Sequence, residues 1–142
     1  MLFKDNLYSI VKQDIGEDVA TFGLRLDADS VIYKAHFPSK PVTPGVCLIQ
    51  IAEELFSISR AERFEIERVK NVKFVSLLDP VASPEIEVEI SCVVPAGEGE
   101  YKSSIVFCSD QTIFSKMSLI FKTKEKLIVK TNINPQIISS AN

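Results

Sequence analysis

The sequence predicts an α+β protein in which a curved antiparallel sheet surrounds one central helix. A segment at about residues 44–59 has a helical pattern and is apolar around most of its circumference, so it must be buried on nearly all sides. Segments after residue 69 alternate between apolar and polar residues and are joined by short turns, which is typical of antiparallel strands. Another alternating segment, at residues 19–26, precedes the helix and favours a further strand there.

Size and composition indicate a single soluble domain. The chain has 142 residues, of which 46% are hydrophobic and 25% charged, and its net charge of −3 argues against nucleic acid as the main partner. The cysteines Cys47, Cys92 and Cys108 show no C-x-x-C spacing, which favours free thiols in a reducing compartment over disulfides or a zinc site. We find no signal peptide and no run of about 18 apolar residues, so we expect a cytoplasmic protein without a membrane partner.

The first third of the chain leads toward the only histidine of the sequence. Residues 1–16 are compatible with either a short helix or a strand, and a turn is expected at residues 15–18. After the strand at 19–26, a polar break and a short apolar run at residues 31–33 bring the chain to His36.

A proline-rich loop connects His36 to the buried helix. Pro38 and Pro41 exclude helical structure over residues 36–43, because proline fixes its own φ and favours an extended residue before it. Thr43 is predicted to be the N-cap residue, and Pro44 the first residue of the helix.

The polar residues of the helix fall on one stripe. At about 100° per residue, this stripe contains Gln50, Glu53, Glu54 and Ser57. It either lines a site or forms the solvated side of the helix.

The second half of the chain is predicted to be mainly strands. Residues 60–68 are charged and are expected to form a solvated connection, and residues 95–99 a hairpin loop. We therefore expect a domain at residues 1–124, followed at 125–142 by either a flexible tail or an arm that packs on a partner. The strands are expected at residues 69–78, 85–94, 101–108 and 112–122.

The loop and the start of the helix carry a specific motif, His36-Phe37-Pro38-x-Lys40-Pro41-x-x-Pro44-Gly45-Val46. It resembles the H-F-P-G-x-P-x-x-P-G-V motif of the hot-dog-fold 3-hydroxyacyl-acyl-carrier-protein dehydratases, and the strand at residues 71–74 also looks like that family. The resemblance covers roughly residues 3–124 and implies a hot-dog fold. It further implies dimers or larger assemblies with sites at the subunit interface. The implied reaction removes water from a 3-hydroxyacyl thioester to give the trans-2-enoyl thioester, in fatty-acid or polyketide-type biosynthesis.

The resemblance also implies roles for individual residues. His36 matches the catalytic histidine, and Gly45 matches the glycine whose backbone N–H holds the thioester carbonyl. The N–H of Val46 suits the same task, because a helix N-terminus presents free donors. Phe37 and Pro44 belong to the motif and are expected to contact the substrate. Neither a metal nor a cofactor is expected.

One departure from the family concerns the general acid. Fourteen positions after the histidine the family has an acidic residue, whereas this chain has Gln50; one turn later, where many members carry Gln, it has Glu54. An amide can orient a hydroxyl group but cannot donate a proton as a carboxylic acid does, and loss of a general acid typically costs about 10²–10⁴-fold in rate. Three outcomes stay open: His36 shuttles the proton alone, Glu54 takes the acid role, or the protein binds acyl thioesters without dehydrating them well.

Partners and competing functions follow from the same features. The substrate is expected on an acyl carrier protein or CoA, and docking of an acidic carrier needs basic residues. The protein is expected to be a homodimer or higher homo-oligomer. The alternatives are a weakly active subunit that pairs with an active homologue, which Gln50 favours, and an acyl thioesterase. The basic residues available for docking are Lys34, Lys40, Arg60, Arg63 and Arg68.

Overall fold

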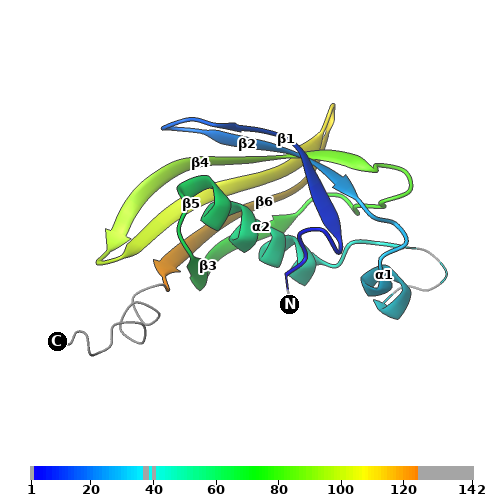
Figure 1. The fold of residues 1–142 in the computed structure, drawn as a ribbon, viewed down its shortest axis with the longest axis horizontal. Coiled ribbons are helices and arrows are strands. Elements are labelled where there is room, and N and C mark those ends of the chain that lie inside the picture. Colours follow the sequence, from blue (N-terminus) through cyan, green and yellow to red (C-terminus); the bar gives the residue numbers. More distant parts are fainter. Residues whose placement is uncertain (1, 37–38, 40, 125–142) are drawn as a thin grey trace, which may run out of the picture.

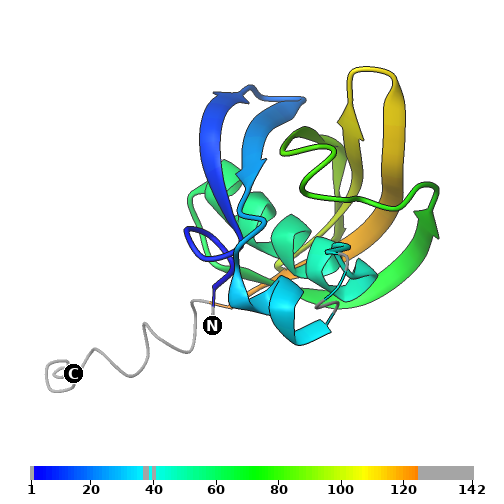
Figure 2. The same ribbon diagram turned by 90° about the vertical axis from the view of Figure 1, so that its right-hand side faces the viewer.

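A curved antiparallel sheet holds one long helix in its concave face, as predicted (Figures 1 and 2). The computed structural model describes residues 2–36, 39 and 41–124, with the side chain of His36 excepted. The predicted C-terminal extension at 125–142 therefore lies outside the described residues. The elements are β1 (Tyr8–Ile15), β2 (Ala20–Leu26), α1 (Val31–His36), α2 (Gly45–Arg60), β3 (Phe64–Phe74), β4 (Glu85–Gly97), β5 (Glu100–Ser109) and β6 (Thr112–Thr123).

The sheet has the strand order β1-β2-β4-β5-β6-β3, and all its neighbouring strands are antiparallel. In β4 the predicted alternation holds, because Ile86, Val88 and Ile90 are buried while Glu87 and Glu89 are exposed. The inward side chains of the strands pack on α2, whose Phe56 ring stacks on that of Phe121 in β6 at a centroid distance of 3.9 Å. Burial on the sheet explains why α2 is apolar around most of its circumference.

The strand β3 corrects two predicted boundaries. Residues 60–68 are not a solvated connection throughout, because the strand already begins at Phe64, whose ring packs on Phe56 at 5.0 Å. The strand ends at Phe74 rather than at Leu78, since the carbonyl of Leu78 leaves the sheet to accept the N–H of Thr43 at 2.8 Å. Long-range packing thus shifted this strand toward the N-terminus relative to its local pattern.

Two further local predictions need correction. The run at residues 31–33 belongs to a short helix, α1, which follows Ser30, whose hydroxyl accepts the N–H of Ile32 at 3.3 Å. The ambiguous residues 1–16 form β1 from Tyr8 onward. The long helix α2 spans almost the predicted residues.

Candidate functional site

A hydrogen bond joins the two helices on either side of the proline-rich loop. The hydroxyl groups of Tyr33, in α1, and Thr43, just before α2, lie 2.8 Å apart, and both residues are buried. Tyr33 stands one helical turn before His36, so the contact holds the backbone of His36 close to the start of α2. Burial raises the pKa of Tyr33 to about 12, so its hydroxyl stays neutral and able to donate.

This contact explains why Thr43 does not cap α2. The N-cap residue is Pro44, with φ −62° and ψ 148°, and the helix begins at Gly45, so the prediction of Thr43 as N-cap and Pro44 as first helical residue was wrong by one position. No side chain of the described residues caps the helix. The N–H groups of Gly45 and Val46 therefore stand at the positive end of a 16-residue helix, where no side chain in the described part of the chain acts as a cap.

No sequence pattern predicted the contact between Gly45 and Phe74. A Cβ built on Gly45 would lie 2.5 Å from the Cζ atom of Phe74, which is closer than real Cβ contacts. The Phe74 ring covers the glycine although 53% of the residue's surface is exposed. Any side chain larger than that of glycine at this position would therefore force the half-exposed Phe74 ring to move.

The remaining predicted site residues are placed only in part. His36 is the last residue of α1, but its side chain, Phe37 and Lys40 lie outside the described residues. Pro44 is half-buried, and the Val46 side chain is exposed. The structure thus brings the backbone of His36 and the start of α2 together without testing the role of the imidazole.

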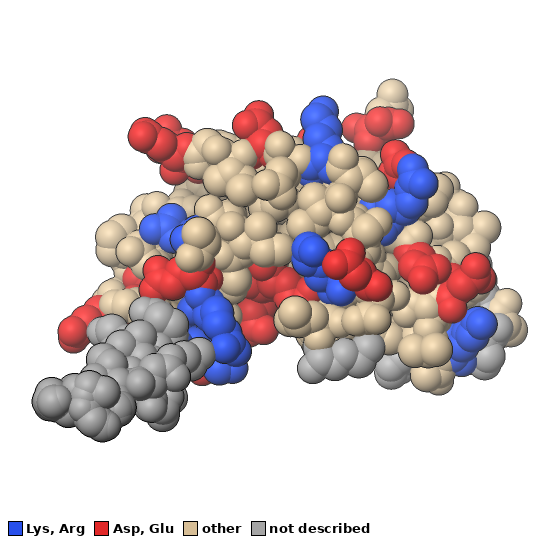
Figure 3. Space-filling view, in the orientation of Figure 1, with Lys and Arg blue, Asp and Glu red and all other residues tan. Residues whose placement is uncertain are grey.

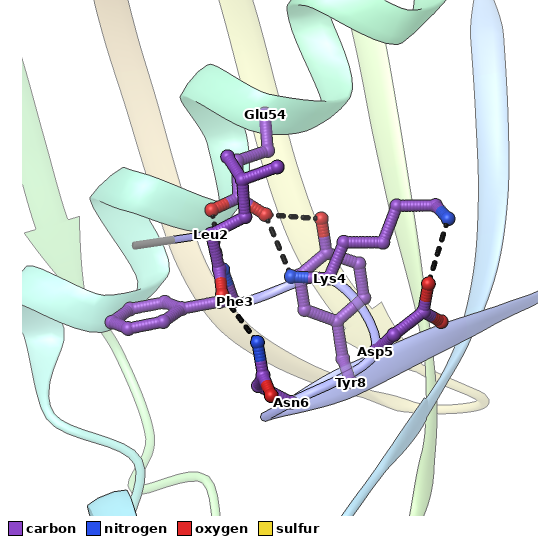
Figure 4. Close-up of polar contacts among 7 residues, drawn as sticks. All are labelled: Leu2, Phe3, Lys4, Asp5, Asn6, Tyr8 and Glu54. Atoms are coloured by element: carbon purple, nitrogen blue, oxygen red, sulfur yellow. Dashed lines mark hydrogen bonds and ion pairs between the residues drawn. The ribbon is translucent and has the colours of Figure 1, made fainter.

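Glu54 is the centre of a buried polar cluster (Figure 4). Its Oε2 atom accepts hydrogen bonds from the Phe3 N–H at 2.7 Å and from Gln50 Nε2 at 3.0 Å. Its Oε1 atom accepts from the Lys4 N–H at 3.0 Å and from the Tyr8 hydroxyl at 2.8 Å. Only 8% of the surface of Glu54 is exposed. The N-terminal segment therefore covers the carboxylate that the sequence offered as an alternative acid.

The bonding around Tyr8 fixes the direction of one of these hydrogen bonds. Burial, and then the hydrogen bond with Glu54, raise the pKa of Tyr8 well above its ordinary value. The tyrosine therefore stays neutral and donates to the carboxylate. Glu54 cannot donate a proton to a ligand without giving up one of its four bonds.

The polar stripe predicted on α2 exists, and its other members bind the neighbouring strand. Glu53 accepts the N–H of Ile66 at 2.8 Å, and the Ser57 hydroxyl accepts the N–H of Phe64 at 3.0 Å. A cavity of about 870 Å³ runs along this stripe. Most of its lining residues are polar or charged, but most of the surface that they present to the cavity is apolar, so the cavity can hold both polar and apolar ligand groups. The lining residues are Leu2, Lys4, Gln50, Glu53, Glu54, Ser57, Ile58, Arg63, Phe64, Glu65 and Lys124.

Of the basic residues proposed for docking, those that the structure describes do not form one patch on a single chain. Lys34 lies in α1, whereas Arg60 and Arg63 lie at the other end of α2, a helix of 16 residues and thus about 24 Å long. Arg60 is also engaged by the ring of Tyr101, 4.4 Å from its guanidinium carbon. On the face shown in Figure 3, basic side chains stand singly among acidic ones.

The Cys47 thiol and the arrangement of the acidic groups bear on two other kinds of chemistry, thiolate reactivity and metal binding. Burial raises the pKa of the Cys47 thiol, so its place in the first turn of α2 does not make it a reactive thiolate. Within residues 2–36, 39 and 41–124, no three His, Cys, Asp or Glu residues cluster as a metal site would require. In the same part of the chain, no helix is both long and apolar enough to cross a membrane.

A buried helix held in the concave face of an antiparallel sheet, with its uncapped N-terminus beside a connecting loop, defines a hot-dog-fold protein. Solved structures share this fold. A dehydratase heterocomplex, ApeI:P, from Xenorhabdus doucetiae matches with a TM-score of 0.64 and 19% identity over 80% of this chain and 96% of that one. A putative thioesterase from Lactococcus lactis matches with a TM-score of 0.60 and 11% identity over 87% of this chain and 97% of that one.

The chain belongs to the ApeI-like family of dehydratases, whose family model, described as ApeI dehydratase, matches residues 12–114. A relative in sequence is the 3-hydroxyacyl-acyl-carrier-protein dehydratase FabZ of Clostridium acetobutylicum. The two are 29% identical over 110 residues, which cover 70% of this chain and 74% of the relative.

Proposed function

We propose that the protein removes water from a 3-hydroxyacyl thioester, carried by an acyl carrier protein or CoA, to give the trans-2-enoyl thioester. The observation that supports this proposal is the hydrogen bond between Tyr33, one turn before His36 in α1, and Thr43, which directly precedes the N-cap residue of α2. The family and the FabZ relative support the same reaction class. A role in fatty-acid or polyketide-type biosynthesis follows from this substrate.

The proposed mechanism assigns both proton transfers to His36. A neutral imidazole removes the proton next to the thioester carbonyl, and the carbon–oxygen bond at position 3 then breaks. The imidazolium returns its proton to the departing oxygen, so that water leaves and the histidine is neutral again. Gln50 orients the departing hydroxyl group, since an amide transfers no proton.

The carbonyl oxygen gains negative charge during this elimination. The N–H groups of Gly45 and Val46 are proposed to hold that oxygen, because the start of α2 offers donors and a positive dipole end. Pro44 and Phe37 are proposed to contact the acyl group beside it. The Phe74 ring over Gly45 would exclude water from the same place.

A second subunit is proposed to complete the site. Exposed apolar side chains surround the start of α2, and β3 lies at an edge of the sheet with one side unpaired among the described strands. Both features suit an assembly of two or more chains, either identical or of two homologues. The similar ApeI:P structure is itself a heterocomplex, which favours the second form as the alternative. The exposed apolar residues are Val46, Phe74, Val75 and Leu77.

Hydration of a crotonyl thioester, the reverse reaction, tests the proposal directly. We expect activity in the parent protein and a loss of about 10²–10⁴-fold in His36→Ala. Activity that survives in His36→Ala would contradict the assignment of the base. Activity that is absent in the parent and appears in Gln50→Glu would support the alternative, a site that depends on a partner subunit for its acid.

A thioesterase is the competing enzyme, because the putative thioesterase of Lactococcus lactis shares the fold. The same assay distinguishes the two reactions. Hydrolysis releases a free thiol, which a thiol reagent detects, whereas hydration and dehydration release none. Thiol release without hydration would replace the dehydratase proposal.

A further inference from the structure

Tyr33 holds the hydroxyl group of Thr43 away from the helix that follows it. The two hydroxyl oxygens lie 2.8 Å apart, and only 1% of the surface of Tyr33 and 5% of that of Thr43 is exposed. Both hydroxyl groups are therefore shielded from water and need a hydrogen-bond partner within the protein. The N–H of Thr43 is bonded separately, to the carbonyl of Leu78 at 2.8 Å, so Thr43 is held through its backbone as well as its side chain.

The local sequence favours a different use of Thr43. Threonine is a preferred N-cap residue, and proline is preferred as the first residue of a helix. In the structure Pro44 is instead the N-cap residue, with ψ 148°, and no side chain in the described part of the chain caps α2. The φ of Pro44, −62°, already suits a helix, so its ψ is the angle that separates the observed helix start from one with Thr43 as N-cap.

The alternative helix start would occupy the two N–H groups that the proposed mechanism needs. The side chain of an N-cap residue accepts a hydrogen bond from the N–H of the second or third helical residue. With Thr43 as N-cap and Pro44 as the first helical residue, the second and third are Gly45 and Val46. The Thr43 hydroxyl would then compete with the thioester carbonyl for the same donors.

We propose that Tyr33 is a positioning residue, which binds the hydroxyl group of Thr43 and so prevents that hydroxyl from capping α2. The N–H groups of Gly45 and Val46 then stay open to the thioester carbonyl. This inference rests on the proposed dehydratase function, and Tyr33 acts only through Thr43, without taking part in proton transfer. Burial raises the pKa of Tyr33 to about 12, so the phenol stays neutral and keeps this bond throughout the physiological pH range.

Hydration of crotonyl-pantetheine by two single variants tests the inference. In Tyr33→Phe the Thr43 hydroxyl loses its partner and turns to the helix start, so kcat/KM should fall about 3- to 6-fold, the effect of an N-cap of about 0.5–1 kcal/mol. The lower part of the usual range for N-caps applies, because the bond from the Thr43 N–H to Leu78 still opposes the shift. Thr43→Val has no hydroxyl that can cap and should keep kcat/KM within about 2-fold of the parent value.

Two double variants distinguish capping from a role as a simple anchor of the loop. Tyr33→Phe with Thr43→Val removes the capping group and should restore kcat/KM. Tyr33→Phe with Thr43→Ser is the matched control, since it changes the same two positions but retains a hydroxyl that caps, and it should stay impaired. If the bond only anchors the loop, Tyr33→Phe, Thr43→Val and their combination lose activity alike.

Amide hydrogen exchange at Gly45 and Val46 gives a readout that does not depend on catalysis. The first N–H groups of a helix exchange readily when they are open, whereas a capping side chain protects the N–H that it binds. Protection of at least one of the two amides should rise about 3- to 6-fold in Tyr33→Phe, in step with the loss of kcat/KM. It should return to the parent level in Tyr33→Phe with Thr43→Val.

The outcomes separate this inference from the proposed function. Unchanged exchange in Tyr33→Phe overturns the inference, as does a combination of Tyr33→Phe and Thr43→Val that stays as impaired as Tyr33→Phe. If Tyr33→Phe does not fold, Thr43→Val decides, because a clear loss of activity in that variant overturns the inference. A parent that does not hydrate crotonyl-pantetheine overturns the proposed function, and exchange at Gly45 and Val46 then decides by itself whether Tyr33 keeps the helix start open.

Discussion

Replacing Glu54 by alanine removes an acceptor that four donors share. The Tyr8 hydroxyl, in a residue only 1% exposed, would lose its acceptor, and an unsatisfied buried donor costs about 1–3 kcal/mol. The N–H groups of Phe3 and Lys4 lie nearer the surface, so water replaces part of their bonds at about 1 kcal/mol each. We therefore expect Glu54→Ala to lower the free energy of unfolding by about 3–5 kcal/mol.

A double-mutant cycle with Tyr8→Phe isolates the buried hydrogen bond. In the parent, Tyr8→Phe should cost about 2 kcal/mol, since it removes a hydrogen bond to a charged group. In the Glu54→Ala background the same change removes a hydroxyl without an acceptor and should be neutral or stabilising. The coupling energy should thus exceed about 1 kcal/mol.

Equilibrium unfolding in urea measures the free energy of unfolding of all four proteins in the cycle. Glu53→Ala is the matched control, because Glu53 is the adjacent helical residue and accepts one bond, from the N–H of Ile66. Its expected cost is about 1 kcal/mol. Additive effects of Glu54→Ala and Tyr8→Phe, or a Glu54→Ala cost no greater than that of the control, would refute the reasoning.

Three other predictions concern the start of α2 and its surroundings. Gly45→Ala places a Cβ 2.5 Å from the Phe74 ring and should lower Tm, whereas in a Phe74→Ala background it should not; equal losses would contradict the contact. Burial raises the pKa of Tyr33 from 10.0 to about 12, so the folded state keeps a proton that the unfolded chain releases. Stability from this group is complete below pH 10 and falls as the pH rises toward 12, and Tyr33→Phe should flatten the dependence of Tm on pH. Lys34→Glu should raise KM several-fold for a carrier-bound substrate at low salt and spare crotonyl-pantetheine; equal changes would count against docking there.

Local patterns predicted much of the fold. The apolar circumference of residues 44–59 placed α2 within one residue at each end, and the alternation in β4 placed that strand and its buried face. These features follow from the periods of a helix and a strand, which neighbouring residues encode. The start of β3 was not predicted, because residues 60–68 are mostly charged and have no clear strand pattern. The strand begins there because Phe64 packs on Phe56.

The candidate site was predicted only as far as a local motif reaches. The motif identified His36, Gly45 and Val46 as candidate site residues. The angular spacing of the polar residues placed Gln50 and Glu54 on one stripe of the helix. Neither pattern could show that Glu54 is covered by the N-terminal segment. That segment contains no signal that distinguishes it from an exposed strand or helix.

By itself, the sequence determined that one buried helix lies in an antiparallel sheet and that a histidine-bearing loop leads into its N-terminus. Both depend on residues close together in the chain. The tertiary structure decided which atoms meet there: the Phe3 N–H reaches Glu54 across 51 positions, and the Phe74 ring reaches Gly45 from the end of β3. Such contacts depend on how the sheet curves around α2, because a carboxylate on a helix has no preferred partner until other elements place donors beside it.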